Sequence, residues 1–88
     1  MFGIFKKKSN VIKLKTNTKV LYRKDKKEVI INCELTYPAK QQNGIVIYVS
    51  ELKEWDNNQD KIRNDEFLVM KNEIYQYFIK EGYSTAIN

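Results

Sequence analysis

Apolar and polar residues alternate through several short stretches in the first half of the chain, with the two-residue period of a β-strand. The segment Val11–Lys15 alternates around Ile12 and Leu14, and Lys19–Arg23 follows a polar turn at Thr16–Thr18. A strand with one buried face and one wet face produces this alternation. The pattern therefore predicts two β-strands joined by a short turn.

A third alternating stretch, Glu28–Leu35, follows a turn at Lys24–Lys27. Its odd-numbered positions share one apolar face, made of Val29, Ile31, Cys33 and Leu35. Cys33 then fills a core position as a small apolar side chain. A reactive thiol is the weaker interpretation, because the sequence offers Cys33 no neighbouring histidine or strongly cationic setting. We expect a third strand with Cys33 on its core face.

The segment Ile45–Val49 is apolar on both faces, which is typical of a central strand covered on at least one side by a helix. It follows the longest irregular connection of the chain, Tyr37–Gly44. Short links between successive strands favour an antiparallel meander. At the other end of the chain, Tyr83–Ile87 either adds a short final strand or trails off, and the pattern leaves both outcomes open.

The C-terminal third of the chain carries the signals of an α-helix. Asn64 or Asp65 caps it, and the acids Asp65 and Glu66 in its first turn complement the helix dipole. The helix runs to about Glu81, and Gly82 is placed to end it. We therefore expect one long helix that supplies much of the core.

The apolar residues of this helix fall on two neighbouring stripes at about 100° per residue. The first stripe holds Phe67, Met70, Ile74, Tyr77 and Phe78, and the second holds Leu68, Tyr75 and Ile79. Together the stripes cover a wider arc than one sheet face usually buries. Either the sheet curls around the helix, which we prefer, or the second stripe meets another chain, which leaves a homodimer open.

These elements predict an α+β fold in which an antiparallel sheet of about four strands, arranged as a meander, is packed by one C-terminal α-helix. Eighty-eight residues make one domain, because chains divide only at roughly 250 residues or more. We assign residues 1–10 to a basic N-terminal tail and residues 11–88 to the single domain. Met1–Lys8, with two Phe and three Lys, is interpreted as a frayed tail in preference to a membrane contact.

The residue types on which enzymes most often rely are missing. The chain has no histidine, which removes the commonest general base and metal ligand. Its single cysteine can neither form an internal disulfide nor hold a metal by itself. We therefore expect a non-enzymatic protein with no catalytic residue, no cofactor, no metal and no small-molecule substrate. The sparse cysteine fits the cytoplasm, and the longest apolar run is far short of the ~20 residues that a transmembrane helix needs.

The net charge of +5 hides an uneven distribution. Residues 1–27 carry a net charge of +9, and residues 28–88 a net charge of −4. The basic part offers phosphate contacts, so a small basic nucleic-acid-binding module is the alternative function. We rank it second, because lysines on strand faces also serve solubility and only Tyr22 is clearly available there to stack on bases. The acidic part can face a basic protein partner.

One ordered set of features follows the first three strands. Gly44 opens the apolar strand, a short turn leads to Trp55, and a polar linker precedes the amphipathic helix. This order resembles the immunity protein 74 family of bacterial polymorphic-toxin and contact-dependent inhibition systems. The earlier strand Val29–Leu35 is also similar to a strand of that family. The resemblance covers roughly residues 18–82.

The resemblance implies a protein that binds and neutralises a cognate toxin, whose activity the family does not fix and which includes nucleases. Immunity proteins to nucleases often present an acidic surface, so the candidate toxin-binding residues are Glu51, Glu54, Trp55, Asp56, Asp60, Asp65 and Glu66. Two other interpretations stay open: Trp55 as core packing beneath the helix, which we prefer, and the acids as a solvated linker and helix cap. Asn57 and Asn58 stand where family members often have prolines.

Overall fold

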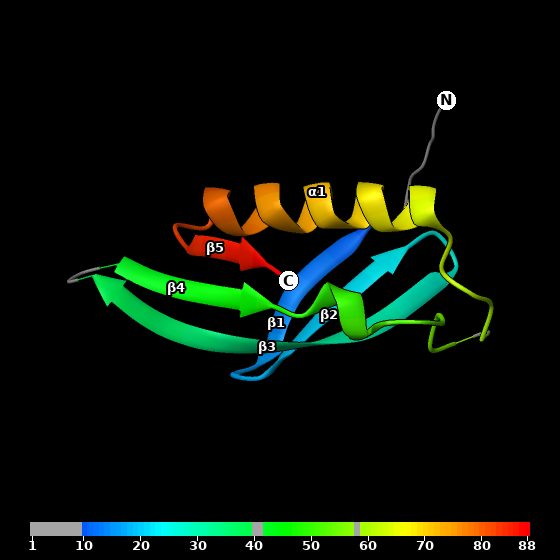
Figure 1. The fold of residues 1–88 in the computed structure, drawn as a ribbon, viewed down its shortest axis with the longest axis horizontal. Helices are drawn as coiled ribbons and strands as arrows, with labels where there is room; N and C mark the ends of the chain where they lie inside the picture. Colours follow the sequence, from blue (N-terminus) through cyan, green and yellow to red (C-terminus); the bar gives the residue numbers. More distant parts are fainter. Residues whose placement is uncertain (1–9, 40–41, 58) are drawn as a thin grey trace, which may run out of the picture.

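The computed structural model describes residues 10–39, 42–57 and 59–88, which form a curved sheet with one long helix across one of its faces (Figure 1). In chain order the elements are β1 Val11–Thr16, β2 Lys19–Lys24, β3 Lys27–Ala39, β4 Gln42–Ile47, the 3₁₀ helix η1 Val49–Glu51, α1 Asn64–Lys80 and β5 Ser84–Ile87. The predicted α+β fold, a sheet packed by one C-terminal helix, is confirmed. Most of the expected N-terminal tail, and the alternative membrane contact at Met1–Lys8, lie outside the described residues.

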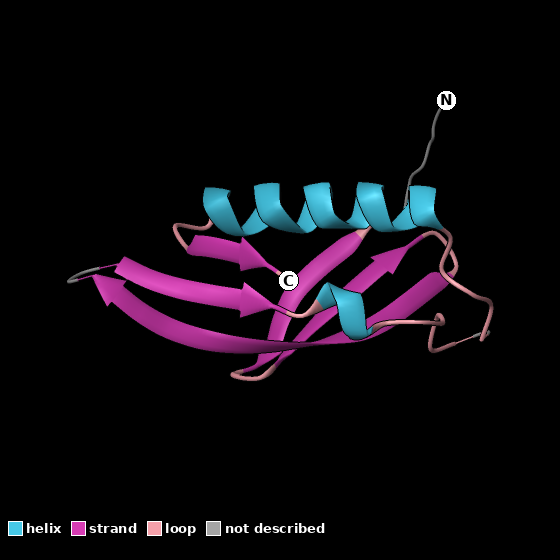
Figure 2. Ribbon diagram, in the orientation of Figure 1, coloured by secondary structure: helices cyan, strands magenta, loops and turns pink. Residues whose placement is uncertain are grey.

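The strands lie in the sheet in the order β1-β2-β3-β4-β5. The first four form the predicted antiparallel meander. β5 pairs parallel to β4, because the chain passes across the sheet as α1 before it returns to the sheet edge (Figure 2). A parallel neighbour requires a crossover of this kind. The final segment is therefore a strand, and the sheet has five strands where the sequence predicted about four.

β3 is thirteen residues long and joins the two halves of the sheet. It pairs with β2 from Lys27 to Asn32 and with β4 from Cys33 to Ala39. The tight turn before it contains Asp25 with φ of 56°, a left-handed conformation that Asp tolerates better than most residues. Because β4 pairs only with the second half of β3, the first half needs another partner along its outer edge.

The core lies between α1 and the sheet face beneath it. Fully buried side chains from the strands and the helix meet there, namely Val20, Val29, Ile31, Ile45, Ile47, Met70, Ile74 and Phe78. Phe67 and Tyr77 are partly buried at the margin of this cluster, so the first helix stripe faces the core as predicted. Cys33 is 5% exposed on the same face, and burial raises the pKa of its thiol.

The strand and helix boundaries differ from the sequence-based prediction at several points. β3 and β4 extend into the segment predicted to be irregular, and β4 ends at Ile47 because Val49 turns into the core to begin η1. The residue that caps α1 is Arg63, one position before the predicted Asn64. Glu66 bonds back to the Arg63 N–H, so the first turn is closed by an acid already inside the helix.

The second helix stripe is not covered by the sheet. Leu68, Tyr75 and Ile79 are 67%, 41% and 43% exposed. The stripe lies about 120° around the helix from Ile74, which points at the centre of the core, and the sheet does not curl that far. The preferred prediction, in which the sheet wraps both stripes, is therefore wrong.

Candidate functional site

The chain between η1 and α1 folds into a loop that holds most of the predicted toxin-binding residues. An isolated antiparallel bridge joins Glu54 to Lys61, and the Trp55 N–H donates to the Asp60 carbonyl at 2.9 Å. These backbone contacts turn the loop back on itself. The loop is therefore held in place, although its described residues form no strand and no helix.

The loop also covers the open edge of β3. The Asp56 N–H donates to the Glu28 carbonyl at 2.7 Å, and the Ile30 N–H donates to Asp56 Oδ2 at 2.7 Å. The Glu28 N–H donates to Asn57 Oδ1 at 3.1 Å. Asp56 and Asn57 thus take the place of a missing strand, which satisfies backbone groups that would otherwise have no partner in the sheet. Asn57 does this at a position where the resemblance led us to expect proline.

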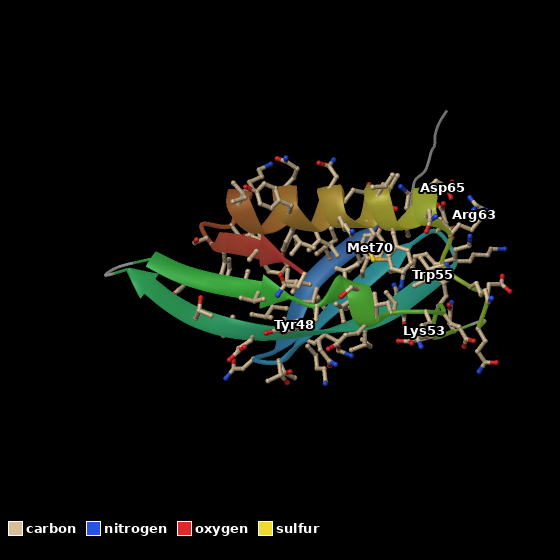
Figure 3. All side chains as sticks on the ribbon, in the orientation of Figure 1. Tyr48, Lys53, Trp55, Arg63, Asp65 and Met70 are labelled. Atoms are coloured by element: carbon tan, nitrogen blue, oxygen red, sulfur yellow. The ribbon has the colours of Figure 1, made fainter. Side chains whose placement is uncertain are left out.

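Trp55 belongs to the loop, and its side chain lies close to the start of α1 (Figure 3). Its side chain is 2% exposed and stacks on Tyr22, with the ring centroids 6.2 Å apart. The Lys27 ammonium is 5.9 Å from the centroid of the indole ring, within the range of a cation–π contact. Trp55 is therefore a core residue, in line with the preferred interpretation, and its ring is not a surface anchor in this conformation.

A shallow groove of about 520 Å³ opens beside the loop and is lined by Glu51, Leu52, Lys53, Glu54, Trp55, Asp56 and Gln59. We call it the acidic groove, because three carboxylates surround it and Lys53 is its one cation. Glu51 accepts a hydrogen bond from the Asn32 amide at 3.1 Å. Within the described residues, no hydrogen bond or ion pair engages the Glu54 carboxylate. The groove therefore keeps carboxylate oxygens available to a partner.

A second hollow, of about 490 Å³, lies between the β2–β3 turn and the first turn of α1. Its lining is mixed in charge and partly aromatic: Tyr22, Lys24, Asp25, Lys26, Lys27, Trp55, Arg63, Asp65, Glu66 and Val69. We call it the hairpin cleft. Lys27 Nζ lies 2.5 Å from Glu66 Oε2, and Arg63 Nη2 lies 3.0 Å from Asp65 Oδ2. Two of the three acids that line the cleft, Asp65 and Glu66, are thus paired within the chain.

Local contacts keep the carboxyl groups of Asp65 and Glu66 ionised. The Arg63 backbone N–H donates to Glu66 Oε1 at 2.9 Å, and this bond, followed by the Lys27 ammonium, lowers the pKa of Glu66. The Trp55 indole N–H makes a smaller contribution in the same direction, although the pair does not reach hydrogen-bond geometry. The Arg63 side chain lowers the pKa of Asp65. These acids stabilise the helix start, as the cap interpretation expected.

The structure divides the seven candidate residues between two places. Glu51 at the end of η1 and the loop residues Glu54, Asp56 and Asp60 lie at or beside the acidic groove. Those of the helix start face the hairpin cleft, namely Asp65 and Glu66. Trp55 lines both hollows from beneath. The acids therefore do not form the single continuous surface that their closeness in sequence suggested.

Two features of the site were not predicted from the sequence. Lys53 belongs to the acidic groove, but a lone lysine between acids gives no signal of this. The hairpin cleft brings Lys27 against Glu66 across 39 residues of sequence, a pairing that only the fold creates. The opposite charges of the two segments were the one available hint.

The carboxylates that line the acidic groove can attract cationic groups. No group of three or more side chains suited to holding a metal ion occurs in the part of the chain that the structure describes. The carboxylates of the acidic groove are spread around a hollow and do not converge on a point. Such a surface suits lysine or arginine side chains, which attract acids over several ångströms.

The chain matches no model of a known protein family. No curated protein and no solved structure is similar to it either. Across residues 10–39, 42–57 and 59–88, no helix is long and apolar enough to cross a membrane.

Proposed function

We propose that this chain is an immunity protein that neutralises a cognate bacterial toxin by direct binding, with the acidic groove as the contact surface. The sequence supports this through the order of Gly44, Trp55, polar linker and amphipathic helix, on which the resemblance to the immunity protein 74 family rests. The observation that carries the proposal is the gathering of Glu51, Glu54 and Asp56 around one groove. A surface of this kind is complementary to the basic residues that a nuclease-type toxin uses against nucleic acid.

The three carboxylates of the groove differ in freedom. Asp56 is held by the Ile30 N–H, so it presents a fixed acceptor. Glu51 and Glu54 are exposed, and their side chains can turn toward a partner. Long-range attraction by these acids speeds encounter, and close pairing with toxin lysines or arginines sets specificity. Occupation of those basic residues would keep the toxin from its substrate.

The test is binding to the product of the gene immediately upstream, because toxin and immunity genes of such systems are normally adjacent. We expect the two proteins to co-elute as one complex and the toxin to lose activity in it. The double variant Glu51→Gln and Glu54→Gln should lower the association rate by about tenfold at low salt, since rim charges act mainly on encounter. The difference should shrink as salt screens the charges.

The matched control is the double variant Glu34→Gln and Glu81→Gln, which removes two exposed carboxylates outside the groove. It should associate at nearly the unmodified rate. If the two double variants slow binding equally, the acidic groove is not the contact surface. If the upstream product is no toxin, and no complex forms, the proposed function fails.

A small nucleic-acid-binding module is the second candidate, favoured by one observation. The sheet face away from α1 carries exposed basic side chains, among them Lys13, Lys19 and Arg23. Lys19 is already bonded to Asn32, and Arg23 is paired with Glu28. Tyr22, the aromatic expected to stack on bases, is buried in the core instead.

This candidate predicts binding to single-stranded DNA or RNA with an affinity that falls steeply with salt. Fluorescence anisotropy with labelled oligonucleotides measures it directly. Absence of binding even at ~50 mM salt, where phosphate contacts are strong, would remove the candidate.

A further inference from the structure

The large apolar side chains left exposed in the described part of the chain all lie on α1. Leu68 is 67% exposed, and Val69, Tyr75 and Ile79 are 43%, 41% and 43% exposed. Between Asp65 and Lys80, the side of the helix opposite the core carries only uncharged residues, namely Leu68, Val69, Asn72, Tyr75, Gln76 and Ile79. A helix face that meets only water is normally charged, whereas loss of charge is typical of the centre of an interface.

Four of these positions have the spacing of a coiled-coil seam. Leu68, Asn72, Tyr75 and Ile79 are separated by four, three and four residues, as successive d, a, d and a positions of a heptad are. They lie along about 16 Å of helix and face one direction. A single polar residue at an a position, here Asn72, restricts register and partner number in such seams. This face is therefore suited to one neighbouring helix.

We propose that this seam packs against the same seam of a second copy of the chain, with the two α1 helices antiparallel. The pattern is self-complementary about the midpoint between Asn72 and Tyr75. Leu68 of one copy meets Ile79 of the other, and Asn72 meets Tyr75. Every layer then joins an a position of one helix to a d position of the other. The two outer layers pair Leu68 with Ile79 and are apolar, and the two inner layers pair the Asn72 amide with the Tyr75 phenol.

Charge selects the antiparallel direction. Asp65 is the next a position toward the N-terminus of the helix, so a parallel pair would bring together two Asp65 side chains, each paired at 3.0 Å with Arg63 of its own chain. In the antiparallel pair, Asp65 lies near Lys80 of the second copy, and the helix dipoles run in opposite directions. The opposed helix dipoles and the nearness of Asp65 to Lys80 therefore favour the antiparallel orientation.

The size of the seam sets the strength of the dimer. Four layers of one helix bury less than the about 800 Å² per partner of a standard interface. The exposed side chains of the seam remain compatible with water, because two of its four layers contain polar groups. We therefore expect a reversible dimer that forms as concentration rises, and not an obligate one.

The first experiment is sedimentation velocity of the whole chain from low micromolar to near-millimolar concentration. We expect a shift from monomer to dimer across this range. Leu68→Glu should remain monomeric, because it places a carboxylate against Ile79 of the second copy. It should stay folded, as Leu68 is 67% exposed in the monomer. Asn17→Asp, with the same change of charge in the exposed β1–β2 turn, should dimerise like the unmodified chain.

The second experiment tests the orientation by disulfide trapping of the double variant Leu68→Cys and Ile79→Cys. Within one chain the two thiols are about 16 Å apart along the helix, too far to join. In the antiparallel dimer each thiol faces its counterpart in the second copy. We expect mild oxidation to trap the double variant as a covalent dimer and to leave both single variants monomeric. Cys33 is buried and should not compete.

Each possible result of these two experiments either supports the antiparallel dimer or overturns it. A chain that stays monomeric at every concentration overturns the proposal, and so do single variants that trap themselves as well as the double variant does. A monomeric chain whose Leu68→Glu variant no longer binds the upstream toxin would assign the seam to the toxin and exclude the second copy. Dimerisation is measured on the chain alone, so its failure leaves the proposed toxin binding standing.

Discussion

Trp55 joins the loop, the sheet and the hairpin cleft through one side chain. Its ring stacks on Tyr22 and lies under the Lys27 ammonium, while its backbone bonds hold Asp60 and Gln59 in the loop. Among the described residues, its indole N–H is the buried side-chain polar atom left without a hydrogen bond. The ring is therefore important for packing, whereas the N–H adds a desolvation cost with no bond to offset it.

Replacement of Trp55 separates these two contributions. Trp55→Ala should lower the free energy of unfolding by about 3–5 kcal/mol, because it leaves a large cavity in the core. Trp55→Phe should lose only about 1–2 kcal/mol, since it keeps an aromatic ring and removes the unbonded N–H. Urea titration followed by circular dichroism measures both values. Equal losses in the two variants would contradict an unbonded N–H.

Tyr22 makes the free energy of unfolding decrease as the pH becomes alkaline. Burial, and then its hydrogen bond to Glu73 Oε1 at 2.5 Å, raise the pKa of its phenol far above the usual value of 10.0. Above pH 10 the unfolded chain therefore loses this proton while the folded chain keeps it, so stability falls as pH rises. The pKa values of Tyr48, bonded to Glu34, and Tyr77, partly buried, are raised as well and add to the loss.

Tyr22→Phe should lower the free energy of unfolding by about 1.5 kcal/mol at neutral pH, because Glu73 loses a charged hydrogen bond. It should also weaken the decline between pH 9 and pH 11 relative to the unmodified chain. Urea titrations at several pH values give both results. An unchanged alkaline slope would show that Tyr22 is not the group that titrates.

At the scale of elements, the loop after η1 forms hydrogen bonds to the β3 backbone that a neighbouring strand would otherwise form. Asp56 and Asn57 supply acceptors to the Ile30 and Glu28 N–H groups along the first half of β3. The first half of β3 is therefore protected on both edges, by β2 on one side and by the loop on the other. Edge protection of this kind limits unwanted pairing with other chains.

Asp56→Ala should expose that edge. The Ile30 amide loses its acceptor, so its hydrogen exchange should accelerate several-fold, whereas the amides of β3 that pair with β4 should change little. Hydrogen exchange followed by NMR measures this residue by residue. Glu54→Ala, which removes a carboxylate from the same loop without a bond to β3, is the control. Equal protection of Ile30 in both variants would contradict the role of Asp56.

The elements that the sequence predicted well are those with a strong local pattern. Alternation around Ile12 and along Val29–Leu35 predicted the early strands, and the helix was predicted to within a residue or two at each end. The parallel pairing of β5 has no local signal, because four residues of Ser, Thr, Ala and Ile suit an edge strand or a tail equally. The exposed helix stripe was misassigned for the same reason, since periodicity shows that a face is apolar but not what covers it.

At the scale of the whole molecule, one core connects every element. Strand residues such as Val20 and Ile47, the helix residue Ile74 and the loop residue Trp55 belong to a single buried cluster. A domain of this size with one core normally unfolds in a single cooperative step. The loop, although its described residues form no helix and no strand, should therefore unfold together with the sheet.

Trp55 is the one tryptophan of the chain, so its fluorescence reports on the loop, while far-ultraviolet circular dichroism reports on helix and sheet. We expect the two signals to give the same urea midpoint and the same slope. A fluorescence transition that precedes the loss of circular dichroism would show that the loop opens independently, which contradicts a single core.

The candidate site was predicted only in part, because it depends on this global arrangement. The acids from Glu51 to Asp60 are close in sequence and stay close in the fold. Asp65 and Glu66 are equally close in sequence, yet the turn into α1 directs them to the hairpin cleft, where Lys27 and Arg63 pair with them. Sequence proximity predicted the composition of the site but not the direction in which its members face.

Cys33 lies at the junction in β3 where pairing with β2 ends and pairing with β4 begins. Its thiol is buried and, with a raised pKa, protonated at neutral pH, so alkylating reagents reach it only when that junction opens. It is also the one cysteine in the chain. The rate of alkylation of the unmodified protein therefore measures how often the two halves of the sheet separate. A partner that slows alkylation when it binds would show that the binding surface is coupled to the interior of the protein.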